Sequence, residues 1–355
     1  MAQKKLGFGL MRLPQSDPND YSKVNMEELK EMVDYFLAHG FTYFDTSYVY
    51  HMGNSETAIR EALVKRHERS SYTLTDKLPT WMVNSISDIE KLLTEQLNKT
   101  GVSYFDYYLM HAMTAQYYEK MKAIGAFEKF KELKAEGRIR HICISFHDTA
   151  DVLEQILSEQ PDIEYVQVIL NYADMQNEGI DIRACYETIV RHGRKVIVME
   201  PVKGGVLANL DEEYTERLKG LDTEKSIASW AIRYAASQPE VFVVLSGMST
   251  MQQMKDNVSY MEDFRPLTEE ETAVIEGIAE EIYAKRPIRL ISSNPGIRHY
   301  IGLYNNRVGM KVRDGWQDII YGSVKARFGS PKELMKTASE EEKEALLKAA
   351  EVYEA

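Results

Sequence analysis

Short apolar runs alternate with amphipathic stretches eight times along the chain, and this alternation limits the possible folds more than any other feature. The runs are rich in β-branched and aromatic residues, as is typical of strands buried on both faces. The predicted strands are Gly7–Leu13, Thr42–Thr46, Tyr72–Lys77, Phe105–Met110, Ile139–Ser145, Tyr165–Leu170, Lys195–Met199 and Val241–Leu245. Eight strand–helix units predict an α/β protein with a closed parallel (β/α)8 TIM barrel. An open doubly wound sheet is the alternative, but no Gly-x-Gly-x-x-Gly follows an early strand.

The last quarter of the chain departs from this repeat. A helix is predicted from about Thr268, followed by an irregular stretch rich in Pro, Gly and Asn over residues 287–306. The charged segment SEEEKEALLKAAEVYEA then predicts a solvated helix at the end. We therefore expect a barrel over residues 1–265 and a mostly helical C-terminal extension over residues 266–355.

Composition excludes several classes of protein. The formal net charge of −12 argues against nucleic-acid binding, which needs clustered Lys and Arg. The two cysteines, Cys143 and Cys185, are too few for a disulfide framework, and Cys143 lies in the apolar run HICIS. No apolar stretch precedes the first glycines or has the length of a membrane span. These features predict a cytoplasmic protein with no membrane or nucleic-acid partner; they leave its oligomeric state open.

Four polar residues fall at or just after the ends of predicted strands two, three and four. They are Asp45, Tyr50, Lys77 and His111. Functional groups of a TIM barrel lie at the carboxyl ends of its strands, so these side chains are expected to meet in one pocket. Taken singly, each has a structural explanation, such as a helix cap, core packing, a solvated lysine or an interior histidine. Their combination on successive strands favours a catalytic site.

Together the four side chains form a proton-transfer unit. A free tyrosine has a pKa near ~10, too high for efficient acid–base work at neutral pH. The Lys77 ammonium is expected to stabilise the Tyr50 phenolate and lower its pKa, while Asp45 holds the ammonium in place. The imidazole of His111 can then hydrogen-bond a carbonyl oxygen.

The segments FDTSYVYHMGNSE, LTDKLP and DYYLMH resemble the motifs of the aldo-keto reductase family in the expected order. The resemblance covers Leu6–Asn257. It implies hydride transfer between NAD(P)H and an aldehyde or ketone, in either direction. In this scheme Tyr50 is the general acid, Lys77 and Asp45 tune it, and His111 orients the substrate. The small-molecule carbonyl or alcohol itself is not identified by the sequence.

The same resemblance implies an extended nicotinamide cofactor across the barrel mouth. Ser145 and Gln167 match the residues that contact the carboxamide, although Phe146 and His147 follow Ser145 where the family usually has asparagine. Met199 takes the place of an aromatic residue that stacks on the nicotinamide ring. The full set of expected cofactor residues is Met11, Arg12, Asp45, Ser145, Gln167, Met199, Pro201, Val202, Gly204, Gly205, Gly247, Ser249, Gln253 and Asn257.

The phosphate-binding segments bear on the choice of cofactor. Gly204 and Gly205 in MEPVKGGVL resemble a pyrophosphate loop, since glycines let backbone N–H groups approach phosphates. In LSGMSTMQQMKDN, Ser249 and Asn257 match the adenosine-phosphate contacts. Gly247 and Gln253 stand where members that prefer NADP have Lys and Arg. Arg12, Lys203 or Lys255 would have to replace those charges, so NAD and NADP both stay open.

The C-terminal extension resembles the branch of the family that carries a ferredoxin-like tail. That branch has cysteine-rich motifs before a segment similar to NPGIRHYIGLYNN, but RLISSNPGI contains no cysteine, so no iron–sulfur cluster is supported. Either the cluster has been lost, or residues near Arg289–Pro295 are missing from this sequence. We expect Tyr48, Trp81, Met113 and Tyr117, together with Met11, to line an apolar substrate pocket.

Two other functions compete with carbonyl reduction. A nicotinamide-binding regulatory or redox-sensing protein could use the same fold, although the complete set of four residues argues against a degenerate site. A metal-dependent hydrolase would need an early His-x-His pair, which the chain lacks, and Lys77 would sit badly among metal ligands. No metal site is therefore predicted.

Overall fold

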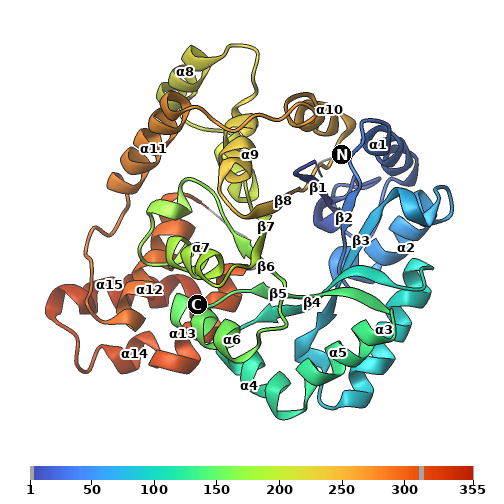
Figure 1. Cartoon of the computed structure of the whole chain (residues 1–355). Coiled ribbons are helices and arrows are strands. Elements are labelled where there is room, and N and C mark those ends of the chain that lie inside the picture. Colours follow the sequence, from blue (N-terminus) through green and yellow to red (C-terminus); the bar gives the residue numbers. More distant parts are fainter. Residues whose placement is uncertain (1–3, 312–315, 355) are drawn as a thin grey trace.

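The computed structural model describes residues 4–311 and 316–354 and contains the predicted barrel (Figure 1). Eight parallel strands close on themselves in chain order, with β8 pairing back to β1. The strands are β1 (Leu6–Gly9), β2 (Tyr43–Asp45), β3 (Thr73–Pro79), β4 (Phe105–Met113), β5 (Ile139–Phe146), β6 (Tyr165–Ile169), β7 (Lys195–Met199) and β8 (Val241–Ser246). The (β/α)8 fold class predicted from the alternating pattern is confirmed.

Helices surround the barrel on its outside (Figure 1). They are α1 (Met26–Ala38), α2 (Ser55–Ile59), α3 (Ile86–Thr100), α4 (Ala115–Ala123), α5 (Ala126–Ala135), α6 (Ala150–Glu159), α7 (Ile182–Arg191), α8 (Glu212–Leu221), α9 (Ile227–Ser237) and α10 (Met251–Met261). Local sequence sets their ends. Before α1, the Asn25 side chain accepts a hydrogen bond from the Glu28 backbone N–H at 3.3 Å. After it, Gly40 takes a φ of +77°, which L-residues rarely adopt.

The first strand is shorter than the sequence predicts. Gly9 pairs with Asp45 at the end of the β1–β2 ladder, and the chain then turns into a 3-10 helix over Leu10–Arg12. Beyond this turn, the Leu13 N–H donates to Nε2 of the buried His51 at 2.9 Å instead of to a neighbouring strand. The prediction of a strand over Gly7–Leu13 is therefore wrong in its second half, because β2 offers no further partner.

The interior of the barrel is packed with side chains rather than hollow. Inward-facing residues from alternating positions form one cluster, which comprises Tyr43, Tyr107, Leu109, Cys143, Ile197, Val243 and Leu245. Its aromatic members pack on one another and on neighbouring rings, and Tyr107 lies edge-on against Tyr165 with centroids 4.8 Å apart. This layer closes the barrel from below, so a ligand can enter only from the carboxyl ends of the strands.

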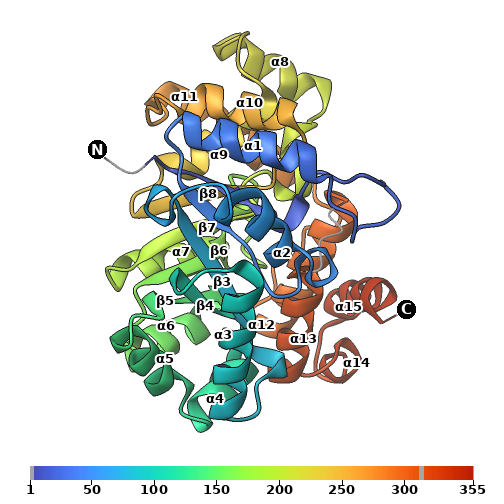
Figure 2. The same cartoon turned by 90° about the vertical axis from the view of Figure 1, so that its right-hand side faces the viewer.

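The C-terminal extension is helical, as predicted. It contains α11 (Glu269–Ala284), α12 (Pro295–Tyr304), α13 (Trp316–Phe328), α14 (Pro331–Leu334) and α15 (Glu340–Tyr353). Figure 2 shows α12 to α15 gathered on one side of the barrel. The predicted division after residue 265 falls between α10 and α11 and stays a prediction. Within residues 4–311 and 316–354, no helix has the length and apolar character to cross a membrane.

One part of the extension is more regular than the sequence predicts. The segment 287–306 was expected to be irregular throughout, yet it is α-helical from Pro295 to Tyr304. The Asn294 side chain caps this helix by accepting from the Ile297 N–H at 3.3 Å. Proline is favoured in the first turn of a helix because its missing N–H has no partner there in any case. The Asn-Pro-Gly sequence is thus a helix start rather than a turn.

Candidate active site

Strand periodicity brings the predicted site residues to one level of the barrel. Alternate residues of a strand face the same side, so a residue two positions after an interior side chain also faces the interior. Asp45 follows Tyr43 by two residues, His111 follows Leu109, and Ser145 follows Cys143. Gln167 and Met199 have the same relation to Tyr165 and Ile197. These groups, which are polar except for Met199, therefore form a layer directly above the packed interior.

A buried ion pair lies at the base of this layer. The Lys77 Nζ donates to Asp45 Oδ1 at 2.5 Å and to the Thr46 carbonyl at 2.8 Å. Both side chains are almost fully buried, with exposures of 0% and 3%. Burial alone would lower the pKa of Lys77, but attraction to Asp45 and Tyr50 raises it above its ordinary value. Lys77 is therefore a fixed positive charge at neutral pH.

Tyr50 lies directly above this charge and faces the cavity. The Lys77 Nζ is 4.9 Å from the centroid of its ring. Burial raises the pKa of Tyr50, and the nearby Lys77 ammonium offsets this only in part, so the pKa stays above its ordinary value. The predicted lowering of the pKa by Lys77 is present, but desolvation of the phenolate outweighs it, so the net shift is upward. Tyr50 is consequently protonated at neutral pH and able to donate a proton.

His111 stands beside Tyr50 as a neutral imidazole. Burial, the Lys77 charge and the neighbouring His147 hold its pKa well below the ordinary value. Its Nδ1 lies 3.1 Å from the Ser47 hydroxyl, and its ring packs edge-on against Tyr50 with centroids 6.2 Å apart. The structure thus brings all four predicted catalytic side chains together.

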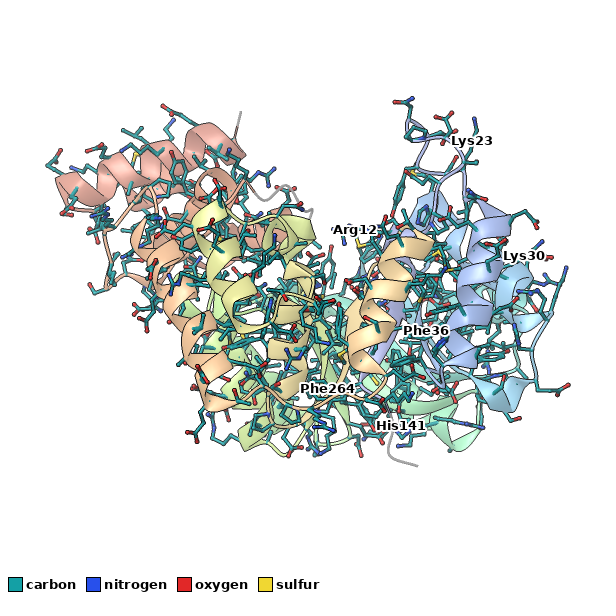
Figure 3. All side chains as sticks on the ribbon, turned by 90° about the horizontal axis from the view of Figure 1, so that it is seen from above. Arg12, Lys23, Lys30, Phe36, His141 and Phe264 are labelled. Atoms are coloured by element: carbon teal, nitrogen blue, oxygen red, sulfur yellow. The ribbon has the colours of Figure 1, made fainter. Side chains whose placement is uncertain are left out.

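A cavity of about 390 Å³ opens above the four residues. Asp45, Tyr50 and His111 line it, and Lys77 lies behind them. The predicted cofactor and substrate residues that also line it are Met11, Arg12, Ser145, Gln167, Met199, Gly247 and Trp81. Figure 3 shows Arg12, which follows the end of β1, well apart from His141, which lies near the start of β5. The cavity is therefore at the carboxyl end of the barrel, as the fold requires.

Three predicted substrate residues are not part of this lining. Tyr48 turns outward, where its hydroxyl donates to Glu95 at 3.1 Å. Met113 is fully buried in the hydrophobic core, and Tyr117, a residue of α4, packs against that core outside the cavity. The prediction that these three residues line the cavity is therefore wrong, because a position near a strand end does not by itself point a side chain into the cavity.

Several predicted cofactor residues also lie outside the cavity lining. These are Pro201, Val202, Gly204, Gly205, Ser249, Gln253 and Asn257. Some of them already have polar partners in the protein, among them Asn257 and Gln253. Asn257 Nδ2 donates to the Ser246 hydroxyl at 2.6 Å, and Gln253 Oε1 accepts from the Ser249 N–H at 2.7 Å. Their role in cofactor binding stays a prediction.

Lys203 cannot replace the missing cofactor-binding charges. Its side chain is fully buried, and its Nζ bonds to Asp174 and to Asn306 Oδ1, the latter at 3.0 Å. The expectation that Lys203 replaces those charges is wrong, because its ammonium already joins Asp174 of the barrel to Asn306 of the extension. Lys255 is exposed on α10.

The loop after β7 binds a carboxylate of the protein itself, that of Glu200. Gly204 and Gly205 have φ values of +64° and +97°, which suit glycine. The Gly204 N–H donates to Glu200 Oε2 at 2.7 Å, while Arg12 lies 3.3 Å from Glu200 Oε1. A carboxylate thus sits between a backbone amide and a guanidinium. This donor set suits a phosphate oxygen equally well.

Sequence reasoning missed several residues of the cavity wall. They are Gly9, Tyr21, Val49, Ala112, His147, Glu200, Leu245 and Ile319. His147 was noted only as a departure, yet its Nε2 lies 3.1 Å from the Ser145 hydroxyl and burial lowers its pKa to about 4. The period-two pattern reveals the strand residue Leu245, but no sequence signal places Tyr21 or Ile319.

The described residues hold no group of three or more His, Cys, Asp or Glu side chains that could bind a metal ion. Cys143 and Cys185 are both buried free thiols, and burial raises their pKa well above the ordinary value. Neither thiol is therefore set up as a nucleophile.

Residues 5–280 match the sequence pattern of the aldo/keto reductase family. The chain belongs to this family and is an oxidoreductase. An uncharacterized oxidoreductase, YqkF, from Bacillus subtilis is 23% identical over 281 residues, which cover 71% of this chain and 88% of the relative.

Solved structures agree with this assignment. The holo form of the aldo-keto reductase AKR11C1 from Bacillus halodurans superimposes with a TM-score of 0.64 and 25% identity over 77% of this chain and 91% of that one. An aldo-keto reductase from Klebsiella pneumoniae in complex with NADPH gives a TM-score of 0.61 at 18% identity. This second alignment covers 79% of this chain and 96% of the Klebsiella chain, and it supports only the fold.

Proposed function

We propose that the protein catalyses the NAD(P)-dependent reduction of an aldehyde or ketone, or the reverse oxidation of an alcohol, with Tyr50 as general acid or base. The observation that carries this proposal is Tyr50 in the cavity lining, with the Nζ of the buried Lys77–Asp45 pair 4.9 Å from the centroid of its ring. A fixed cation nearby stabilises the phenolate that forms when a tyrosine releases its proton. Lys77 is that cation.

Each residue then has a defined task in carbonyl reduction. A bound reduced nicotinamide cofactor would supply the hydride for this reaction. Tyr50 donates its hydroxyl proton to the carbonyl oxygen, and Lys77 stabilises the phenolate that remains. Asp45 keeps the ammonium in position through its 2.5 Å contact. His111, held neutral, donates a hydrogen bond that orients the carbonyl oxygen.

The residues present fit a nicotinamide cofactor. Ser145 and Gln167 offer buried polar groups to a carboxamide at the cavity wall, and the Met199 side chain can pack on a ring. The Gly204 amide and Arg12 already hold a carboxylate, which supports phosphate binding there. Neighbours of the same fold in complex with NADPH and with NADP and acetate support this cofactor class.

Charge at the start of α10 favours NAD(H) over NADP(H). By resemblance, the adenosine end of the cofactor lies near Ser249. There, Glu28 Oε1 accepts from the Met251 N–H at 3.0 Å, so a carboxylate already occupies the first turn of the helix. Gln253 carries no charge and Lys203 is committed to Asp174. A 2′-phosphate would meet the Glu28 carboxylate, whereas a 2′-hydroxyl could donate to it.

The test combines cofactor titration with a carbonyl panel. Fluorescence titrations with NADH and NADPH side by side give both dissociation constants, and the absorbance of each reduced cofactor is then followed with a series of aldehydes and ketones. We expect tight binding and carbonyl-dependent oxidation of the cofactor. Tight binding with no turnover on any carbonyl would refute the enzymatic proposal and favour the regulatory or redox-sensing function.

A further inference from the structure

One wall of the cavity comes from the C-terminal extension. Ile319 on α13 lines the cavity together with Tyr50 and Trp81, although it follows Tyr50 by more than two hundred residues. Of the lining residues that the structure describes, it alone lies beyond residue 280, where the match to the family ends. The extension therefore adds to the site something that the family pattern does not contain.

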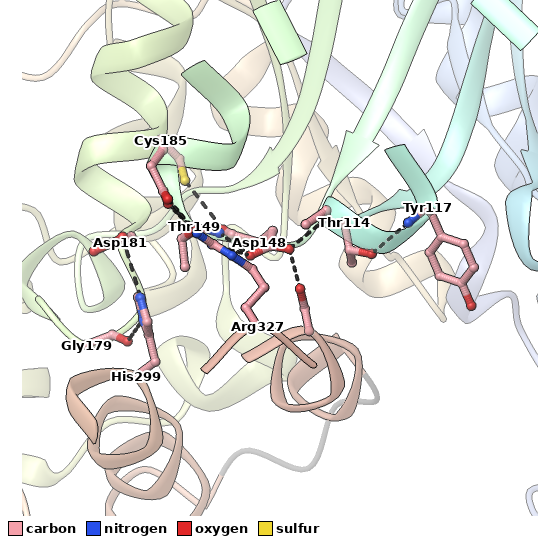
Figure 4. Close-up of polar contacts among 12 residues, drawn as sticks. Thr114, Tyr117, Asp148, Thr149, Gly179, Asp181, Cys185, His299 and Arg327 are labelled. Carbon is pink, nitrogen blue, oxygen red and sulfur yellow. Dashed lines mark hydrogen bonds and ion pairs between the residues drawn. The ribbon is translucent and has the colours of Figure 1, made fainter. Parts of the chain in front are cut away.

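Helix α13 is held in this place by the buried carboxylate of Asp148, which directly precedes α6. Asp148 accepts from the N–H groups of Ala115 at 2.9 Å and Thr149 at 2.8 Å, which orients it on the barrel. From α13, the Ser323 hydroxyl donates to Asp148, and the Arg327 guanidinium lies 3.4 Å from it. Figure 4 shows Arg327 reaching from α13 to Asp148 and Thr149.

The contacts share one face of α13. Ile319, Ser323 and Arg327 are spaced four residues apart, so they lie along a single stripe of the helix. Arg327 also pairs with Asp151 at 2.5 Å. The contacts of Ser323 and Arg327 with Asp148, which we call the Asp148 latch, therefore fix the rotation of α13 that points Ile319 at the cavity. The loops it joins follow β4 and β5, whose ends carry His111 and Ser145.

The rim of the cavity is apolar, whereas its base is polar. Met11, Tyr21 and Val49 line the rim and are each about two-fifths exposed, at 39%, 41% and 41%. Trp81 and Ile319 add further apolar surface. Asp45, Ser145 and Gln167 lie at the base, where the strands end. A carbonyl group bound at the base would extend its carbon skeleton along this rim.

We infer that Ile319 is a specificity-determining residue that contacts the carbon skeleton of the substrate and favours carbonyl compounds with an extended apolar substituent. This inference rests on the proposed carbonyl reduction. It assigns to the extension a role in choosing the substrate, with the Asp148 latch as the device that positions Ile319.

The test measures kcat and KM for straight-chain aldehydes from propanal to octanal. We expect the wild-type kcat/KM to rise with chain length. In Ile319→Ala the octanal-to-propanal ratio of kcat/KM should fall about tenfold, mainly through KM, because a contact made equally in the bound and transition states is lost. Ile319→Phe should move the preference to shorter aldehydes. Leu347→Ala is the matched control, since Leu347 is an exposed apolar residue of α15 outside the cavity.

The latch is tested on α13 itself. Arg327→Met should reduce the octanal-to-propanal ratio in the same direction as Ile319→Ala, whereas Lys325→Met should not, because Lys325 bonds to Glu354 instead. Circular dichroism of each variant checks that it is folded. The inference would be overturned, and the proposed function would stand, if both Ile319 variants kept the wild-type octanal-to-propanal ratio of kcat/KM. An equal fall of that ratio in Leu347→Ala would have the same consequence. A wild-type protein that reduces no aldehyde or ketone would overturn the proposed function and this inference together.

Discussion

Two buried lysine–aspartate pairs lie in different regions of the molecule and make a direct comparison. Lys77 and Asp45 lie at the mouth of the barrel, and Lys203 and Asp174 lie where the barrel meets the extension. Both lysine side chains have an exposure of 0%. The chemical groups are the same in the two pairs. Only their surroundings differ.

The surroundings decide what each pair can do. Asp174 also accepts from the side-chain amides of Asn171 at 2.7 Å and Asn306 at 3.2 Å, and neither member of the Lys203 pair lines the cavity. In the other pair, Asp45 Oδ2 has no hydrogen-bond partner among the described residues and faces a site that contains Tyr50. A fully satisfied buried pair fixes a structure, whereas an incompletely satisfied pair beside a cavity can serve chemistry.

Replacing each lysine by methionine should have the largest effect and should separate the roles of the two pairs. Lys77→Met should lower kcat by about 10²- to 10⁴-fold, because Tyr50 loses the charge that stabilises its phenolate. Lys203→Met should retain most of its kcat at saturating cofactor. Urea unfolding should show that each variant loses about 3–5 kcal/mol, since each leaves a buried carboxylate without its partner. Equal losses of kcat in the two variants would refute the division of roles.

A substitution at Gly179 disturbs the second region without touching a charge. An added Cβ would lie 2.5 Å from the Gly302 backbone of α12, and backbone cannot yield as a flexible side chain can. Gly179→Ala should reduce the free energy of unfolding by about 1–3 kcal/mol. Gly220→Ala in α8 is the control, since its Cβ meets nothing within 4 Å. Similar unfolding curves for the two variants would show that α12 is not closely packed on the barrel.

The proposed preference for NAD(H) depends on a third carboxylate, that of Glu28. Glu28→Gln removes the negative charge near the expected 2′-phosphate, so the dissociation constant for NADPH should fall about fivefold while that for NADH changes little. Glu27→Gln is the matched control, because Glu27 has a side-chain exposure of 84% and pairs with Lys30. Fluorescence titration measures both. An unchanged NADPH constant in Glu28→Gln would contradict the proposed selectivity.

The smallest expected effect concerns Glu56 of α2 and Asp76 of β3. These two residues form a buried carboxyl pair next to Lys77. Burial and mutual repulsion raise the pKa of Asp76 well above its ordinary value, and burial raises that of Glu56. A folded state that holds its protons more tightly is most stable below the unfolded pKa, near ~4, and loses stability as pH rises toward the folded values. The free energy of unfolding of Glu56→Gln, relative to that of wild type, should therefore increase as the pH rises from 5 to 8. A constant difference in urea unfolding over that range would contradict these pKa shifts.

The barrel and the positions of its candidate catalytic residues could be predicted because their signals are local and periodic. Eight buried strands leave a repeating pattern, and the residues that follow Tyr43 and Leu109 by two positions must share their face. Asp45 and His111 are therefore placed by periodicity once the strands are known. The family motifs supplied the same residues independently.

What the sequence did not provide depends on contacts between distant segments. Lys203 and Asn306 are 103 residues apart, and only the docked extension shows that this lysine is used in the structure. Ile319 enters the cavity from a helix that carries no motif. Tyr48 lies within a motif, yet its contacts with Glu95 and Lys99 hold it outward. The sign of the Tyr50 pKa shift also depended on the extent of its burial.

The central claim is that Tyr50 delivers the proton during carbonyl reduction. It is tested most directly by comparing the steady-state kcat of wild type and Tyr50→Phe, with the dissociation constant of the reduced cofactor measured in both. The account predicts a loss of kcat of about 10²- to 10⁴-fold with an unchanged cofactor constant, because only the hydroxyl group is removed. Undiminished turnover in Tyr50→Phe would contradict the account.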